Sequence, residues 1–228
     1  MPIQKNLKQI LDNIERIKKD KNIKRDITLV AISKTYAADK VLEAFTAGQC
    51  DFGENRVQEG TEKASKINND KIIWHLVGHL QSNKASKAVR YFDVIHSVDS
   101  EKIAGEINKF AKQYNKNPEV FIQVNTSGED AKSGCGPDET EYLCKYIINE
   151  CPNIKLCGLM TIGPFYGTEN DTRSCFKQLY NISRKLADKY GQEYMKNLSM
   201  GMSGDYELAI EEGATHLRIG SAIFGARL

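Results

Sequence analysis

Eight short apolar segments, separated by stretches of helical character, constrain the fold more than any other feature of the sequence. The apolar segments lie near residues 27–33, 50–53, 72–77, 92–96, 119–125, 155–160, 196–200 and 215–219. Regular alternation of strands and helices is typical of parallel strands joined by crossover helices. Eight such units predict an α/β fold in which the strands close into a single (β/α)8 barrel of the TIM type.

Helix signals fill the stretches between the apolar segments. Gly48 marks the end of one helix, and Asp99 and Ser100 are capping candidates at the start of another. The expected helices cover residues 38–48, 55–67, 99–114, 138–150, 171–190 and 204–213. A doubly wound open sheet is the rival architecture, but the segment "GCGPDE" at 134–139 lacks the third glycine of a nucleotide fingerprint. The closed barrel is therefore favoured.

Residues 1–20 predict an extra N-terminal helix that covers the barrel. Apolar residues recur there at helical spacing among charged ones, namely Ile3, Leu7, Ile10, Leu11, Ile14 and Ile17. No linker rich in Pro, Gly or Ser divides the chain, so residues 1–228 are expected to form one domain.

Charge and cysteine content exclude several classes of protein. The 32 basic and 30 acidic residues are interspersed and give a net charge of +2, which is unlike the basic footprint of a nucleic-acid binder. No segment reaches the roughly 18 consecutive apolar residues of a membrane span. The six cysteines include no C-x-x-C pair, so we expect reduced thiols, no metal site and a cytoplasmic location.

Lys34 is an unusual residue at the exit of the first expected strand, "ITLVAISK". Side chains alternate along a strand, so Lys34 shares a face with Val30 and Ile32. If that face is the barrel interior, partial desolvation lowers the pKa of the amine, and a neutral amine can attack a carbonyl. The alternative is a lysine whose amine reaches back into water.

A second group of residues follows the last two expected strands, where barrels of this type often hold a phosphate. Glycines and hydroxyls gather there, namely Gly201, Ser203, Gly204, Gly220 and Ser221. Arg218 shares the parity of Gly220 and can face the same barrel mouth. These glycines can also be ordinary loop and cap residues. An amine for an aldehyde, a phosphate cradle and a cation near a ring together suit pyridoxal 5'-phosphate (PLP).

Ordered sequence blocks then resemble the YggS/PROSC family of PLP homeostasis proteins. They run from "AISKTYAADKVLEAFTAGQCDFGENRVQE" through "WHLVGHLQSNK", "HSVDS", "FIQVNTSGEDAKSG" and "GLMTI" to "LSMGMSGDYELAIEEGATHLRIGSAIFGAR". The resemblance implies a barrel similar to the N-terminal domain of alanine racemase, with PLP held as a Schiff base on Lys34. It also implies that Ser203, Gly220 and Ser221 bind the phosphate, that Arg218 faces the pyridine nitrogen, and that Asn55 in "FGEN" belongs to the site.

An arginine at the pyridine nitrogen has a consequence for function. Because it does not readily give up a proton, it disfavours the protonated ring that stabilises carbanions. In the racemases a tyrosine from another subunit's extra β domain also serves as a base, and we expect no such domain here. We therefore expect a PLP carrier without strong catalytic activity, a monomer that supplies PLP-dependent apoenzymes. A PLP-dependent racemase or lyase, or a Schiff-base aldolase acting on a phosphorylated sugar, are the alternatives.

Other candidates receive a structural interpretation. Tyr36, Tyr166 and Tyr206 near strand exits are expected to pack or to lie on the surface. His75, His79 and His96 have no nucleophile beside them in the sequence pattern, so they too are assigned structural roles. The long loops at 125–139 and 161–172 are expected to be mobile lids.

Overall fold

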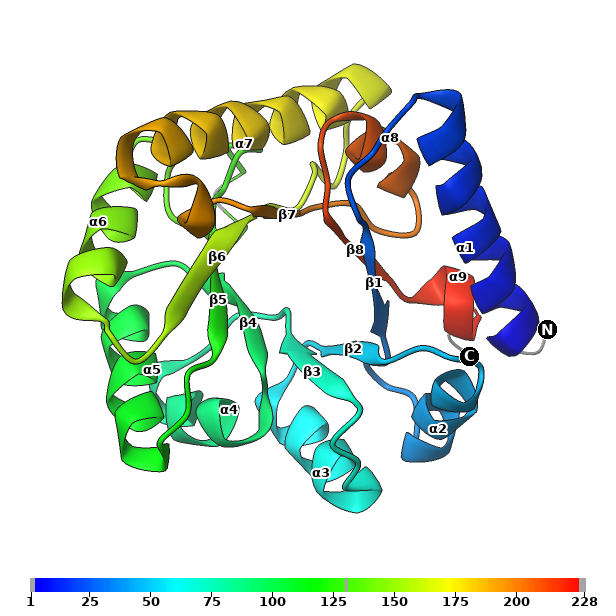
Figure 1. The fold of residues 1–228 in the computed structure, drawn as a ribbon, viewed down its shortest axis with the longest axis horizontal. Coiled ribbons are helices and arrows are strands. Elements are labelled where there is room, and N and C mark those ends of the chain that lie inside the picture. The colour runs from blue at the N-terminus through cyan, green and yellow to red at the C-terminus, as the bar shows by residue number, and fades with distance from the viewer. Residues whose placement is uncertain (1–2, 130, 226–228) are drawn as a thin grey trace.

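The computed structural model describes residues 3–129 and 131–225, which build a closed barrel of eight parallel strands (Figure 1). Each strand pairs with its neighbours in chain order, and β8 pairs with β1 to close the ring. The strands are β1 Thr28–Ile32, β2 Asp51–Glu54, β3 Ile73–Leu76, β4 Val94–Val98, β5 Glu119–Gln123, β6 Lys155–Met160, β7 Asn197–Ser199 and β8 His216–Ile219. The predicted TIM-type barrel and all eight predicted strands are confirmed.

Helices surround the strands. They are α1 Ile3–Asp20, α2 Ala38–Thr46, α3 Val57–Ile67, α4 Ala85–Tyr91, α5 Glu101–Tyr114, α6 Thr140–Glu150, α7 Glu169–Tyr190, α8 Tyr206–Glu211 and α9 Ser221–Phe224, with short 3-10 turns at Ser82–Lys84 and Gln192–Tyr194. The sequence did not predict α4 or α9. With 7 and 4 residues, each is too short to show a repeating apolar face.

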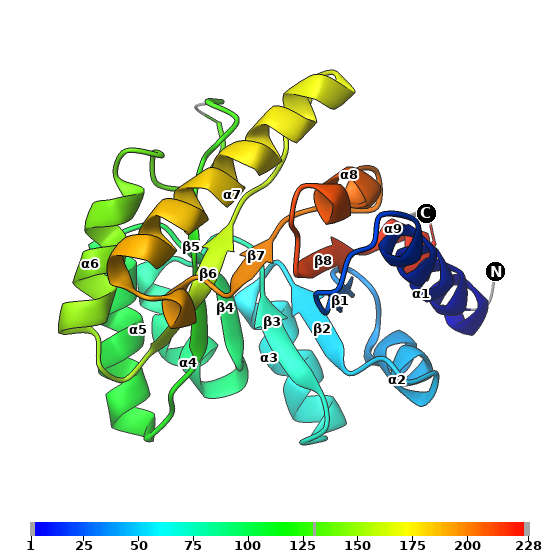
Figure 2. The same ribbon diagram turned by 45° about the horizontal axis from the view of Figure 1, so that its top comes forward.

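Helix α1 lies outside β1 and β8, beside α9 (Figures 1 and 2). The four residues of α9 cannot cover this flank, and α1 covers it with a stripe of buried residues, namely Ile3, Leu7, Ile10, Ile14 and Ile17. Burial of each such side chain contributes roughly 1.5–3 kcal/mol. The predicted covering helix is thus present, although Leu11 was wrongly included in its apolar stripe, since that side chain is 42% exposed. Residues 1 and 2 of the predicted helix lie outside the described residues.

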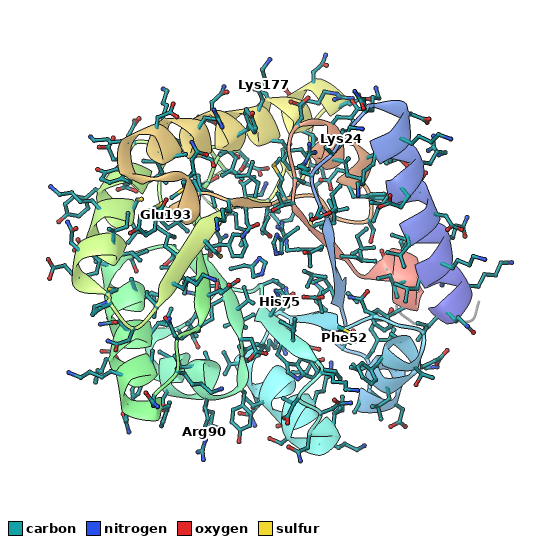
Figure 3. All side chains as sticks on the ribbon, viewed as in Figure 1. Lys24, Phe52, His75, Arg90, Lys177 and Glu193 are labelled. Carbon is teal, nitrogen blue, oxygen red and sulfur yellow. The ribbon has the colours of Figure 1, made fainter. Side chains whose placement is uncertain are left out.

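Alternate residues of β1 face different cores. On β1, Leu29 and Ala31 belong to the large core between the strands and the helices, whereas Val30 and Ile32 pack with Val77 in a small separate cluster. The even-numbered face of β1 is therefore the barrel interior, as the position of Lys34 required. Figure 3 shows the same division: His75 lies within the ring of strands, and Arg90 extends outward from α4.

The structure also bears on membrane insertion and on the thiols. None of the helices within residues 3–129 and 131–225 is both long and apolar enough to cross a bilayer. All six cysteines are free, and burial raises the pKa of Cys135 and Cys151 to about 11. These two thiols therefore stay protonated at neutral pH.

Candidate functional site

One cavity of about 420 Å³ opens at the carboxyl ends of the strands. Its lining combines apolar side chains with an amine, a guanidinium, hydroxyls and glycines: Ile32, Lys34, Asn55, Val77, Ile162, Phe165, Met202, Ser203, Gly204, Arg218, Gly220 and Ser221. All six residues that the sequence singled out as a cofactor site are among them, namely Lys34, Asn55, Ser203, Arg218, Gly220 and Ser221. Two larger depressions of about 680 and 600 Å³ lie on the outer helices and lack this combination.

Lys34 follows β1 by two residues, in a turn instead of at the strand end that the sequence predicted. The backbone is held on both sides of it. Lys63 Nζ donates to the Ser33 carbonyl at 2.7 Å, and the Thr35 N–H donates to Glu59 Oε1. Thr35 has a φ of 69°, which is unusual for a β-branched residue. The turn therefore places Lys34 in the cavity by fixing its two neighbours.

Behind this turn lies a buried group of charges, which we call the Lys63 cluster: Ser33, Glu54, Glu59 and Lys63. Lys63 Nζ lies 2.7 Å from Glu54 Oε1 and 2.8 Å from Glu59 Oε1, and Ser33 Oγ donates to Glu54 Oε1 at 2.6 Å. Glu54 is fully buried, and burial raises the pKa of its carboxyl, an effect that the Lys63 and Ser33 hydrogen bonds oppose. The sequence analysis did not identify this cluster.

Asn55 reaches the cavity from the end of β2, where its backbone is tightly enclosed. A Cβ at Gly78 would lie 2.1 Å from the Asn55 carbonyl oxygen, so no side chain fits at position 78. This explains the glycine in "WHLVGHLQSNK" and fixes the backbone of Asn55.

The loops after β7 and β8 face the cavity together. The Ala222 N–H donates to Ser203 Oγ at 3.4 Å and so links the two loops. A Cβ at Gly204 would meet nothing within 4 Å, which leaves its backbone open to a ligand, whereas Gly220 packs against the Ile32 carbonyl. Gly201 does not line the cavity; its φ of 92° and its contact with Ala209 explain that glycine.

Arg218 is buried, with 5% exposure, between the cavity and the barrel interior. It donates to Ser199 Oγ at 2.7 Å and to the Thr161 carbonyl at 2.8 Å. Burial lowers the pKa of the guanidinium to about 10, and Asp205 acts in the opposite direction. Arg218 is therefore still a cation at neutral pH.

The tyrosines and histidines that the sequence analysis assigned to structural roles are absent from the described lining of the cavity. Tyr36 donates to the Gly225 carbonyl at 2.7 Å, Tyr206 accepts from Asn13, and Tyr166 is 95% exposed. His79 pairs with Asp99 on the surface. His75 and His96 are buried in the barrel interior, and their rings lie near that of the half-buried His216, which the sequence analysis passed over.

The two long loops differ in their relation to the site. Ile162 and Phe165, from the loop after β6, line the cavity, and Phe165 is 68% exposed. The described part of the loop after β5 instead folds back on its own strand, where the Cys135 N–H donates to the Gln123 carbonyl at 2.9 Å. Mobility of either loop stays a prediction.

Comparison with known proteins gives first the class and then the family. Residues 6–228 match the family described as alanine racemase, N-terminal domain. A relative from Vibrio cholerae, named pyridoxal phosphate homeostasis protein, is 42% identical over 231 residues, covering 99% of this chain and 96% of its own. The chain belongs to the alanine racemase N-terminal domain family and, within it, to the pyridoxal phosphate homeostasis proteins.

Solved structures agree with this assignment. PipY of Synechococcus elongatus with PLP bound has a TM-score of 0.86 and 34% identity, covering 98% of this chain and all of its own. Alanine racemase of Clostridium difficile has a TM-score of 0.76 at 19% identity, and this chain covers 57% of it. The racemase likeness concerns the fold.

Proposed function

We propose that this protein binds PLP covalently through Lys34 and keeps the reactive aldehyde restrained but available, as part of intracellular PLP homeostasis. The main support is that one cavity of about 420 Å³ is lined by an amine, a buried guanidinium and two loops that supply hydroxyls and glycines. That volume falls within the roughly 300–1,000 Å³ of small-molecule sites. The names of the relatives and the bound PLP in PipY support the same ligand.

The lining fits the three chemical parts of PLP. Ser203 and Ser221 offer hydroxyl donors, and Gly204 leaves its backbone open, which suits the phosphate. Arg218 supplies a charged donor for the pyridine nitrogen, and Ile32, Val77 and Ile162 supply apolar contacts for the ring. Asn55 lines the same cavity and offers an amide group. When bound, PLP supplies an aldehyde that forms a reversible bond to an amine.

Lys34 makes the covalent link in this proposal. Its neutral amine attacks the aldehyde carbon, a carbon–nitrogen double bond replaces the carbon–oxygen double bond, and the aldehyde oxygen leaves as water. Addition of water reverses the bond and releases the ligand. The clamped turn around Lys34 presents the amine without ordering the chain anew at each binding event.

Weak or absent catalysis follows from two features of the lining. Arg218 stays charged and donates, so it does not protonate the pyridine nitrogen. Apart from Lys34, the described lining holds no His, Asp, Glu, Tyr or Cys that could act as a second acid or base. The names of the relatives describe homeostasis and not an enzyme. We accordingly propose a monomeric cytoplasmic carrier that supplies PLP-dependent apoenzymes.

The covalent link is tested by adding PLP to the purified protein, recording the visible absorbance, and fixing the adduct with borohydride before peptide mapping. We expect a visible band in the wild type and label on Lys34. Lys34→Ala should lose both, while Lys40→Ala, an exposed lysine on α2, should keep both. Label on another lysine, or a colourless protein that instead traps a ketose phosphate, contradicts the proposal.

A turnover assay tests the carrier role separately. We expect no Lys34-dependent racemisation or elimination over a broad amino-acid panel, and transfer of PLP from the loaded protein to an apoenzyme. Robust turnover that Lys34→Ala abolishes would identify an enzyme.

A further inference from the structure

The barrel interior beneath the cavity is polar where packed apolar layers are usual. Four consecutive hydrogen bonds cross it from Arg218 to Asp51 at the start of β2. Arg218 donates to Ser199 Oγ at 2.7 Å, Ser199 Oγ lies 2.8 Å from His96 Nδ1, His96 Nε2 lies 2.9 Å from His75 Nδ1, and His75 Nε2 lies 3.0 Å from Asp51 Oδ1. Ser199 and His96 are fully buried and His75 is 1% exposed.

The chemistry of the two ends fixes the direction of every bond. Arginine only donates, so the Ser199 hydroxyl accepts from Arg218, and its own hydrogen goes to His96 Nδ1. Neutral His96 then carries its hydrogen on Nε2 and donates to His75 Nδ1. His75 in turn carries its hydrogen on Nε2 and donates to the Asp51 carboxylate, which only accepts. Both ends therefore demand the same arrangement, with two neutral histidines in the Nε2–H form.

The reverse arrangement leaves groups unsatisfied. If His75 were an imidazolium, its Nδ1–H would donate to His96, and His96 Nδ1–H would donate to Ser199. The Ser199 hydrogen would then have no acceptor among the hydrogen bonds of the described residues. A buried hydroxyl without a partner is unfavourable. The neutral arrangement gives each of the four hydrogen bonds one donor and one acceptor.

The surroundings of His96 also favour a neutral ring. Burial is the largest cause that holds the pKa of His96 well below its usual value, followed by His75, His216 and Arg218. His216 lies against this pair, with ring centroids 6.1 Å from His96 and 6.4 Å from His75, and burial lowers its pKa to about 3. Phe121 stacks on His96 at 4.4 Å and closes the other side.

We propose that Asp51, His75, His96 and Ser199 form a positioning chain that holds the Arg218 guanidinium toward the cavity as a fixed donor. The chain polarises every hydrogen bond away from Arg218, so Ser199 always accepts the same guanidinium N–H and leaves the remaining N–H groups to a ligand. The Thr161 carbonyl fixes a second nitrogen of the guanidinium. The part of the proposal that concerns the pyridine nitrogen rests on the proposed PLP function.

Replacement of Asp51 tests the direction of the chain. Asp51→Asn keeps the shape but adds a donor at the acceptor end, so His75 and His96 can adopt the opposite ring form. In the ligand-free protein, long-range ¹H–¹⁵N NMR at neutral pH should show both histidines in the Nε2–H form in the wild type and mixed forms in Asp51→Asn. Asp93→Asn is the matched control, because Asp93 only accepts from the Trp74 N–H and an amide oxygen does the same.

Replacement of Ser199 tests the link to Arg218. Ser199→Ala removes the acceptor of a buried charged donor and should weaken PLP binding about tenfold or more. Ser199→Ala should also shift the visible band of the bound PLP, and Asp51→Asn should shift it to a smaller extent. Ser199→Thr keeps the hydroxyl, so its PLP affinity and visible band should match those of the wild type. Circular dichroism and urea midpoints show whether each variant is folded. If a variant does not fold, the histidine ring forms of the wild-type protein still test the direction of the hydrogen bonds.

The outcomes separate this proposal from the proposed function. Nδ1–H forms in the wild type, or Asp51→Asn and Ser199→Ala variants with unchanged ring forms, affinity and band, would overturn the positioning chain while PLP binding stands. A wild type that binds no PLP would overturn the function, and the NMR of the ligand-free protein would still judge the chain.

Discussion

Two polar groups flank the cavity, and each positions a basic residue of the site by a different kind of interaction. On the β1–β2 side, the Lys63 cluster positions Lys34 with full charges, since Lys63 Nζ contacts both Glu54 and Glu59. On the β7–β8 side, the positioning chain supports Arg218 with a hydroxyl and neutral imidazoles, and its only carboxylate, Asp51, lies at the far end. Most partners on both sides are buried, whereas Glu59 and Asp51 are half-buried, and only the Lys63 cluster brings opposite charges into direct contact.

The difference between the ionic and the neutral partners follows from the two residues that they position, Lys34 and Arg218. In the proposed function Lys34 would react as a neutral amine, and the charges of the Lys63 cluster act on the backbone of Ser33 and Thr35. Arg218 keeps its own charge at neutral pH and donates to two neutral oxygens, Ser199 Oγ and the Thr161 carbonyl. The ionic side should therefore be the more sensitive to loss of one partner, because a buried charge is left behind.

The largest effect is expected when the Lys63 cluster is broken. Lys63→Met keeps the length of the side chain but leaves the fully buried Glu54 without its cation. Removal of one partner of a buried pair costs about 3–5 kcal/mol. We expect the free energy of unfolding, measured by urea denaturation, to fall by that amount at neutral pH.

Lys40→Met provides the control for this substitution. Lys40 pairs with Glu43 at 2.8 Å on the surface of α2, where both side chains are exposed. Solvent screens such an exposed pair, so Lys40→Met should change the free energy of unfolding far less than Lys63→Met. Equal effects of the two substitutions would show that the Lys63 cluster is not a buried ion pair.

A pH titration distinguishes the two sides by the sign of their response. His96 and His216 have folded pKa values below their unfolded values, so their contribution to stability is present above about pH 6.5 and is lost as the pH falls. Each such histidine lowers the unfolding free energy by up to about 1.4 kcal/mol per pH unit. Glu54 has a raised pKa, so its contribution is full below the unfolded value and is lost as the pH rises through the folded one.

Urea denaturation at pH 7, 6 and 5 should therefore show stability falling with acid, because the histidine response begins at the higher pH. His96→Gln should reduce this slope by up to about 1.4 kcal/mol per pH unit. A flat profile in the wild type would mean that the pKa values of His96 and His216 are not lowered in the folded protein.

The sequence predicted the residues that line the cavity, but it did not predict the Lys63 cluster or the positioning chain that hold Lys34 and Arg218 in place. Parity along β1 and β8 placed Lys34 and Arg218 at one mouth, because in a closed parallel barrel all strand exits meet at the same end. Asn55, Ser203, Gly220 and Ser221 follow from the same rule. The roles of these six residues in PLP binding stay predictions until the labelling experiment is done.

The supporting groups depend on contacts that no local pattern encodes. Ser199 and His96 lie 103 positions apart, and a register shift between Ile95 and Val98 disturbs the alternation that would have placed side chains on β4. Lys63 looks like an ordinary helix lysine four residues after Glu59. Only the closed ring shows that its amine reaches under the turn at Lys34.

The smallest effect concerns strain, which also differs between the two sides. Positive φ outside glycine occurs among the described residues at three asparagines and at Thr35, beside Lys34. Thr35 is exposed, so little packing depends on its side chain. Asparagine tolerates this conformation better than a β-branched residue, and Thr35→Asn should raise the unfolding free energy by about 0.5–1 kcal/mol.

The reciprocal Asn68→Thr, at the left-handed cap of α3, should lower it by a similar amount. If Thr35→Asn were destabilising while Asn68→Thr behaved as expected, the Thr35 side chain would have to stabilise the turn itself, and the clamp on Lys34 would extend beyond the Lys63 cluster.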